Sequence, residues 1–254
     1  MCTLSFLPEA DGYVVGMNRD ELKSRSVANG PEIHKTGEVH AIYPHETAGG
    51  TWIAANSRGN LLALLNWNLA NIGQLPEKLR SRGVIIPSLM KEEAAEGTER
   101  ALKTCQLVGV HPFRLIGIFA SEQDIREWRW DGQNLRSRWH EWARNHWFSS
   151  SRSDVRAEAT RNKACEMMWQ GAGEPPVCWL RKLHSSHLPE AGAYSICVHR
   201  EDASTVSFTE VQYCMDKLAM TYVAGNPCTP KGEPMTVRIS TMPVSRVAGA
   251  KLAV

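Results

Sequence analysis

The first twenty residues carry the pattern that most restricts how this chain can fold. Two short runs of apolar and β-branched residues, "CTLSF" and "YVVGM", flank the segment "LPEADG". Proline, aspartate and glycine favour turns, so the two runs are expected to pair as an antiparallel hairpin. A hairpin at this place puts Cys2 both at the start of a strand and directly behind the initiator methionine.

The register of this hairpin predicts the neighbours of Cys2. With residues 8–12 as the turn, Cys2 lies opposite Asn18, give or take one residue, and directly opposed residues are about 5 Å apart. The segment that follows, with Arg19 and Asp20, is thereby brought to the side of Cys2.

A second hairpin is predicted from "GGTWIAAN" and "NLLALLNW", with a turn at residues 57–59. Its register brings Asn66 opposite Gly50, so that a side-chain amide faces a stretch of open glycine backbone. The return strand is almost continuously apolar, as expected for a strand covered on both faces.

The rest of the chain predicts a layered α+β fold. We expect helix over residues 76–104, broken at Pro87 and Gly97, and again over 154–170 and from "PPVCWLRKLHSS" onward. Strands are expected in "FRLIGIFA", in a hairpin "IREWRWDGQNLRSRW", and in "YSICVHREDASTVSFTEV" and "MTYVAG", with no assignment after residue 225. Strands and helices come in groups rather than as βαβ units, and no linker or repeat is seen. One domain over residues 1–254 is therefore predicted.

Composition restricts the compartment and the partners. The net charge of +2 indicates no general attraction to nucleic acid. Seven scattered cysteines without C-x-x-C spacing argue against a zinc site or a disulfide framework and favour a reducing compartment. The apolar runs fall short of the roughly 18 residues of a membrane helix, and no secretory signal is seen. We expect a cytoplasmic protein without membrane insertion.

The residues around Cys2 suit an N-terminal nucleophile. Removal of Met1 would leave Cys2 with both a thiol, of ordinary pKa about 8.5, and an α-amine of pKa about 7.7–8.0 that can take the thiol proton. Arg19 would favour the thiolate, and Asp20 would hold the amine. Asn66, with a backbone N–H near the glycines, would donate to a developing oxyanion.

Structural alternatives exist for each of these residues. Cys2 can instead be an ordinary small residue that starts a strand. Arg19 and Asp20 can form a salt bridge that closes the mouth of the hairpin. The glycine pair that ends at Gly50 can be a bulge that admits Trp52 to the core.

These residues also carry a resemblance to a known family. "MNRDE" with a cysteine at position 2, followed by "GGTWIAANSRGNLLALLN", resembles the NRDE family, whose animal members are transport and Golgi organisation proteins. The similarity is strongest over residues 1–70 and resumes at "LRSRG", "WFSSS", "ATRNK" and "VSFTE". The family is similar to N-terminal nucleophile hydrolases such as the penicillin and bile-salt amidases. The resemblance therefore implies a four-layer αββα sandwich.

The resemblance also implies roles for individual residues. Cys2 becomes the nucleophile, Arg19 and Asp20 its companions, and Asn66 an oxyanion donor. The expected substrate-binding residues are Asn18, Gly50, Thr51, Trp52 and Ser150. Where relatives have "GLSN" this chain has "WFSSS", so one of the serines 149–151 substitutes for the asparagine or the group is missing. The late arginine of the amidases has no assigned counterpart.

Two classes of function follow. The first is a cysteine amidohydrolase or acyltransferase that cleaves a non-peptide C–N amide of a small molecule through a Cys2 thioester, with no cofactor. The second is a non-catalytic relative that binds or traffics a hydrophobic ligand such as haem, acyl-CoA or a lipid, with a role in Golgi organisation or secretion in the animal relatives. A homo-oligomer is left open.

Two further motifs suggest other functions. The segment "REWRWDGQNLRSRWHEWARNHW" holds five of the nine tryptophans interleaved with arginines, a pattern that would suit single-stranded RNA or haem. Acidic residues interrupt it, and alternation of this kind is also typical of a strand with one buried face. His184 and His187 suggest a metal, but no third ligand stands out, so no metal is predicted.

Overall fold

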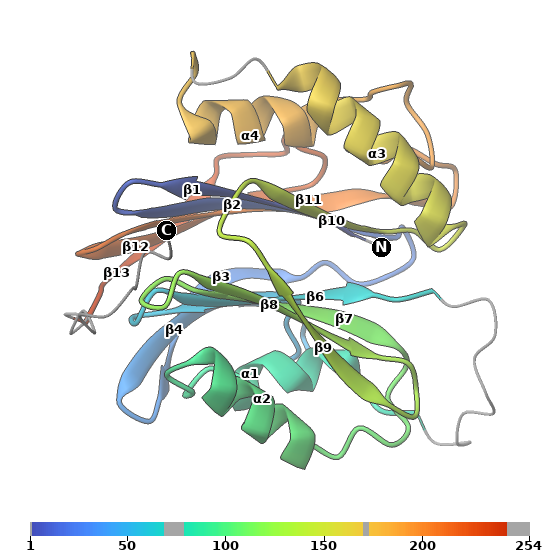
Figure 1. The fold of residues 1–254 in the computed structure, drawn as a ribbon. Coiled ribbons are helices and arrows are strands. Elements are labelled where there is room, and N and C mark those ends of the chain that lie inside the picture. Colours follow the sequence, from blue (N-terminus) through green and yellow to red (C-terminus); the bar gives the residue numbers. More distant parts are fainter. Residues whose placement is uncertain (1, 69–78, 170–172, 243–254) are drawn as a thin grey trace, which may run out of the picture.

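Two antiparallel sheets stacked face to face form the centre of the molecule, and helices cover both outer faces (Figure 1). The computed structural model describes residues 2–68, 79–169 and 173–242. The first sheet has the strand order β10-β1-β2-β11-β12-β13, and the second runs from β3 to β9 in chain order. This is the predicted four-layer αββα arrangement.

The first sheet is built from strands far apart in the sequence. Its members are β10 (Asn145–Ser149), β1 (Cys2–Glu9), β2 (Gly12–Leu22), β11 (Ala203–Cys214), β12 (Lys217–Ala224) and β13 (Met235–Ser240). The second sheet is a meander of β3 (Asn29–Thr36), β4 (Val39–His45), β5 (Ile53–Asn56), β6 (Asn60–Asn66), β7 (Phe113–Phe119), β8 (Asp124–Trp130) and β9 (Leu135–His140). The second sheet therefore pairs strands that follow one another in the chain, whereas the first pairs strands from both ends and the middle of the sequence.

The helices close the two outer faces. The helices α3 (Asp154–Met168) and α4 (Pro176–Ser185) lie over the first sheet, and the short helices η1 (Arg82–Val84), α1 (Ile85–Leu89) and α2 (Ala95–Thr104) lie over the second (Figure 1). Capping explains two of the starts: the Ser153 hydroxyl accepts the Arg156 N–H, and Pro176 occupies the first position of α4. None of the described helices is long and apolar enough to cross a membrane.

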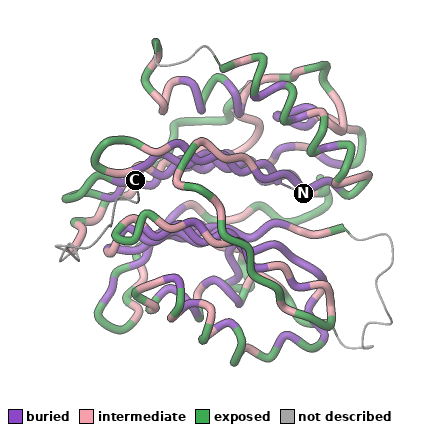
Figure 2. The backbone as a smooth tube through the Cα atoms, viewed as in Figure 1, coloured by how far each residue is buried: buried purple, intermediate pink, exposed green. Residues whose placement is uncertain are grey.

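Strand alternation divides the buried residues into three layers. In β1, Cys2, Leu4 and Phe6 face the second sheet, whereas Leu7 packs with residues of α3 and α4. A third cluster lies between the second sheet and α1 and α2. Figure 2 shows the result, with buried backbone concentrated in the two central layers. Both faces of β1 are covered, which accounts for its continuous burial.

Some predicted elements were wrong. The helical segment is not broken at Pro87 or Gly97. Pro87 is the third residue of α1, where a backbone N–H needs no partner within the helix. Gly97 lies in the first turn of α2, which continues past it. The interruption lies at residues 90–94 instead. The strands β3, β4, β10 and β13 were not anticipated. Among these, β3 and β13 are sheet edges with mostly exposed or half-buried residues, so they lack an apolar signal.

The tryptophan-rich segment spans β8, β9 and the start of β10, and three of its five tryptophans are buried. Trp128 and Trp130 are buried on β8, and Trp147 is buried on β10. Trp139 on the outer strand β9 is 57% exposed. Packing therefore accounts for most of the tryptophans in this segment.

A buried carboxylate ties the second sheet to the first. Glu127 on β8 accepts from Arg114 Nε at 2.6 Å and from Arg129 Nε at 2.8 Å, and lies 2.8 Å from His140 Nε2. Arg114 Nη1 in turn donates to the carbonyl of Phe148 on β10 at 3.2 Å. Burial alone would raise the pKa of Glu127, but the hydrogen bonds from His140 and the two arginines hold this pKa well below its usual range.

The first prediction concerns this network. The substitution Glu127→Gln leaves Arg114, whose side chain is 7% exposed, without its carboxylate, so we expect a loss of about 3–5 kcal/mol in the free energy of unfolding. Urea denaturation measures it. The control Glu96→Gln removes one partner of an exposed pair and should cost about 1 kcal/mol or less.

The same network predicts a pH dependence. Because the pKa of Glu127 is depressed in the folded state, its stabilisation is present above its ordinary pKa of about 4.3 and is lost as the pH falls further. Between pH 5 and pH 3 the free energy of unfolding of wild type should therefore fall more than that of Glu127→Gln. Equal losses in the two proteins would contradict the ionised network.

Candidate functional site around Cys2

Cys2 is fixed by two neighbouring strands. As the first residue of β1 it pairs with Arg19 of β2 on one side and with Ser149 of β10 on the other. The hairpin register thus agrees with the expectation of Asn18 give or take one residue. The Cys2 side chain faces the second sheet and is 6% exposed.

Ser149 is the serine that contacts Cys2. Its hydroxyl accepts the backbone N–H of Cys2 at 2.9 Å, and its side chain is fully buried. Ser150, which the sequence analysis chose, lies one residue further along, where its hydroxyl accepts the N–H of Arg152 and its own N–H donates to Asp154. Which of the serines 149–151 replaces the asparagine was left open, because only the β1–β10 pairing selects among them.

Arg19 has the expected position beside Cys2 but an unexpected partner. Its guanidinium lies 4.3 Å from the centre of the Trp52 ring and donates to Glu46 at 2.5 Å. Arg25 reaches the same carboxylate at 2.9 Å. Part of the positive charge expected to act on Cys2 is therefore neutralised by Glu46, a residue that the motif did not indicate.

Asp20 points to the opposite face of β2, toward α3. Its Oδ1 accepts from the Thr205 hydroxyl at 2.7 Å, and its Oδ2 lies 3.5 Å from Nη2 of Arg161. Arg161 is fully buried, and its Nη1 donates to the Thr3 hydroxyl at 2.9 Å and to the Cys2 carbonyl at 3.3 Å. Burial raises the pKa of the Asp20 carboxyl, against the opposing effects of Arg161 and of the amino-terminal charge.

Two arginines were missed by sequence reasoning. Arg161 contacts both the Cys2 carbonyl and Asp20. Arg82 also lies near Cys2: burial lowers the pKa of Arg82, and the negative charge of a Cys2 thiolate opposes this effect. The stretches "LRSRG" and "ATRNK", which carried the resemblance, contain these two residues. The resemblance to the NRDE family was therefore the sequence signal that could have indicated both arginines.

The glycine pair allows the Arg82 segment to approach. A Cβ on Gly50 would lie 3.1 Å from the Cα of Gly83, and the Thr51 N–H donates to the Gly83 carbonyl at 3.0 Å. Gly49 adopts φ +83°, a conformation that favours glycine. The two glycines therefore serve a turn and a close backbone contact with η1, which positions Arg82.

Three predicted substrate-binding residues have structural partners. Asn18 is fully buried on the helix side and donates to the carbonyls of His184 and Ile196 at 2.8 and 3.0 Å, so the structure does not bring it to the Cys2 side chain. The Thr51 hydroxyl donates to the Ile53 carbonyl at 2.9 Å. Trp52 is buried against Arg19, and its indole N–H has no hydrogen-bond partner in the described part of the chain.

Asn66 ends β6 on the facing sheet. The β5–β6 ladder has the predicted register, with Ile53 opposite Ala63, but it ends before Gly50 is reached. Within the described residues the half-buried Asn66 amide has no hydrogen-bond partner. β6 contacts β1 and β10, and Figure 1 shows the end of β6 and the start of β1 at the same end of the sandwich. An unused donor thus lies on the strand that faces Cys2.

The Cys2 thiol is protonated at neutral pH. Burial raises its pKa above the ordinary value, and the Asp20 carboxylate adds to this, whereas Arg19 and the Asp20 backbone N–H lower it. We expected Arg19 to favour the thiolate, but burial outweighs it. A surface hollow of about 580 Å³ lies over Arg152 and Tyr194, and Cys2 is not among the residues that line it.

The second prediction uses this pKa. At pH 7 iodoacetamide should label Cys2 more slowly than the exposed Cys214. The labelling rate of Cys2 should rise about tenfold per pH unit to beyond pH 9, because only the thiolate reacts. Peptide mass spectrometry of timed reactions measures both rates. Labelling of Cys2 ahead of Cys214 at neutral pH would contradict the burial described above.

Comparison with solved structures places this sandwich among the N-terminal nucleophile hydrolase folds. It is similar to a mutant of conjugated bile acid hydrolase from Clostridium perfringens, with a TM-score of 0.54, 10% identity, and 93% and 92% of the two chains covered. It is also similar to penicillin V acylase from Agrobacterium tumefaciens, with a TM-score of 0.52, 10% identity, and 94% and 86% covered. At these identities the likeness shows the fold, and it confirms the predicted α+β sandwich.

The family follows from the sequence itself. The model of the family "Transport and Golgi organisation 2" matches residues 1–165. The chain belongs to this family, which confirms the resemblance seen in "MNRDE" and "GGTW". No curated protein matches the chain.

Proposed function

We propose that this protein is a cysteine N-terminal nucleophile amidohydrolase or acyltransferase that acts on a non-peptide C–N amide. One observation carries the proposal: Cys2 is the first residue of an inner strand, and its backbone nitrogen is already bound by the Ser149 hydroxyl at 2.9 Å. Removal of Met1 would turn that nitrogen into a free α-amine beside the thiol of the same residue.

The reaction then proceeds through a thioester. The α-amine takes the Cys2 thiol proton, and the thiolate attacks the amide carbonyl to form a tetrahedral oxyanion. The C–N bond breaks, and the leaving amine takes the proton from the Cys2 ammonium. Water, or a second amine in the acyltransferase case, attacks the thioester, gives its proton to the Cys2 amine and releases the acyl group as the thiol reforms.

The surrounding residues support these steps. Asp20, whose Oδ2 has no hydrogen-bond partner among the described residues, offers a negative charge that favours the protonated amine. Arg161 holds the Cys2 carbonyl and so fixes the main chain of the nucleophile. Asn66 has an unused amide on the facing strand, which suits an oxyanion donor.

Burial of Cys2 favours a second candidate. A thiol that is 6% exposed and has a raised pKa is also what a non-catalytic relative would have, one that binds a hydrophobic ligand such as haem, acyl-CoA or a lipid. In that case the buried ion pair beside Cys2 would be a structural feature of the sandwich.

The third prediction concerns maturation. The functional protein should lack Met1, because the small cysteine side chain permits trimming and the mechanism needs its free amine. Intact-mass spectrometry of protein purified from its own host should show a mass short by one methionine. A retained Met1 would block the amine and support the ligand-binding candidate.

The fourth prediction concerns turnover of an acyl-amide library by the trimmed protein. Cys2→Ala should abolish turnover, and Cys2→Ser should leave at most a trace, since an alkoxide is harder to form than a thiolate. Asn66→Ala should lower kcat by about 10²- to 10³-fold with little change in KM, because its donor acts mainly on the oxyanion. Cys214→Ser is the matched control and should behave like wild type. Turnover that survives Cys2→Ala would exclude Cys2 as the nucleophile.

A further inference from the structure

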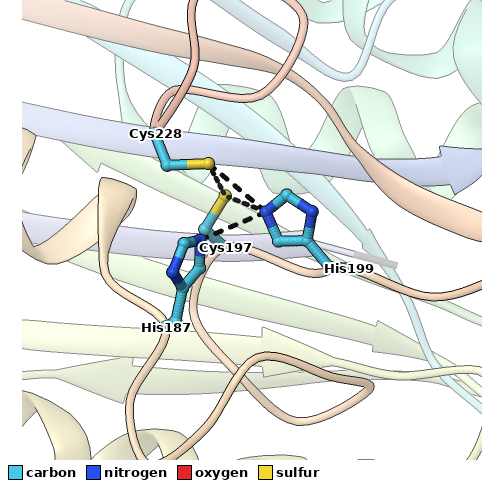
Figure 3. A group of neighbouring side chains, drawn as sticks. All are labelled: His187, Cys197, His199 and Cys228. Atoms are coloured by element: carbon cyan, nitrogen blue, oxygen red, sulfur yellow. Dashed lines mark hydrogen bonds between the residues drawn. The ribbon is translucent and has the colours of Figure 1, made fainter.

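Four metal-ligating side chains meet on the helix-covered side of the first sheet. His187 follows α4, Cys197 and His199 lie in the connection from α4 to β11, and Cys228 lies between β12 and β13. Figure 3 shows the four side chains pointing toward one another from these separate segments. Their ligand atoms all lie within 4.8 Å of one another.

Four of the six distances between these atoms are close to those of a tetrahedral zinc site. A tetrahedral Zn²⁺ with Zn–S of about 2.3 Å and Zn–N of about 2.0–2.1 Å sets its ligands about 3.8 Å apart for S···S, about 3.5 Å for S···N and about 3.3 Å for N···N. Here Cys197 Sγ and Cys228 Sγ are 3.6 Å apart, and His187 Nε2 and His199 Nε2 are 3.2 Å apart. His199 Nε2 lies 3.6 Å from Cys197 Sγ and 3.3 Å from Cys228 Sγ.

We propose that His187, Cys197, His199 and Cys228 bind one Zn²⁺ ion. Two thiolates and two imidazoles are a ligand set that favours zinc over the hard cations Mg²⁺ and Ca²⁺. Four protein ligands fill a tetrahedral shell and leave no position for water or substrate, so the ion has a structural role.

Two hydrogen bonds hold one of the ligands in place. The Cys197 N–H donates to the Ser186 carbonyl at 2.9 Å, and the Cys197 carbonyl accepts from the Ser195 hydroxyl at 2.5 Å. They fix the main chain from which the Cys197 thiol projects.

The site lies next to the residues that support the Cys2 region. Between Cys197 and His199, the Val198 N–H donates to the Thr205 hydroxyl at 2.8 Å, and that hydroxyl donates to Asp20. The carbonyl of Ile196 accepts from Asn18. A zinc ion would therefore fasten the β12–β13 connection to the segment that positions Asp20 and Asn18.

No metal was predicted from the sequence, because the spacing of these four ligands does not resemble a known metal motif. The ligands form the pattern H-x₉-C-x-H-x₂₈-C, in which no two cysteines are close in sequence. His184, considered beside His187, lies in the core 3.0 Å from the Ser5 hydroxyl and takes no part. The remaining ligands become neighbours only through the packing of three segments.

The fifth prediction is measured on the full-length protein purified without added chelator. Metal analysis by mass spectrometry should find about one zinc per chain, as expected for a closed four-ligand site. The variants Cys228→Ser and His187→Ala should lose it, whereas Cys214→Ser, at an exposed cysteine outside the cluster, should keep it. His187 is exposed, so its removal tests metal binding without emptying the core.

Cobalt substitution gives a second, spectroscopic readout. Wild type freed of metal and titrated with Co²⁺ should develop thiolate-to-cobalt charge-transfer absorption and the visible bands of tetrahedral geometry. The affinity for Co²⁺ should fall in His187→Ala by at least the roughly 10- to 100-fold that loss of an outer-shell partner costs.

Three outcomes would overturn the proposal. They are wild-type protein without zinc, zinc content that is unchanged in the two ligand variants, and a Cys197–Cys228 disulfide detected in the native protein by peptide mass mapping. None of these measurements involves turnover, so the zinc site and the proposed amidase activity fail or stand separately.

Discussion

The antiparallel pairing of β1 with β10 is the contact on which the rest of the Cys2 region depends. It joins residues 147 positions apart in the sequence, and its first pair is Cys2 with Ser149. Because α3 follows β10 directly, the same pairing brings Arg161 against the Cys2 carbonyl and Asp20. Without it Cys2 would be the free end of a hairpin, with Arg19 as its only ordered neighbour across the ladder.

The buried charges beside Cys2 are costly for the fold. Asp20 Oδ2 and Arg161 Nη2 are 3.5 Å apart, longer than the 2.7–2.9 Å or so of a strong charge-assisted hydrogen bond. Both side chains are fully buried, and such a pair often stabilises a protein less than apolar residues of similar volume would. Local cost of this kind is common at functional sites, which agrees with a role for the pair in chemistry at Cys2.

The Glu127 network shows the contrasting, well-satisfied case. Its carboxylate has three close partners, and the Arg114 guanidinium also reaches the first sheet through Phe148. Charge is therefore well compensated between the two sheets and poorly compensated on the helix-covered side of the first sheet. The difference lies in the number of hydrogen bonds that each buried carboxylate receives.

The sequence by itself determined the local features. Turn chemistry predicted the first hairpin to within one residue, and it predicted the β5–β6 register that pairs Ile53 with Ala63. Periodicity predicted the helix found at Asp154–Met168 and the buried face of β8, and "MNRDE" with "GGTW" indicated the family. These signals are readable because the partners are only a few residues apart.

Only the tertiary structure decided which distant groups meet. It selected Ser149 among three serines, brought Arg161 to Asp20, and gathered the two cysteines and two histidines of the proposed zinc site from three segments. It also buried Cys2 so that its thiol pKa is raised despite Arg19. Such outcomes depend on how the layers pack and on how much water they exclude, and neither leaves a periodic trace in the sequence.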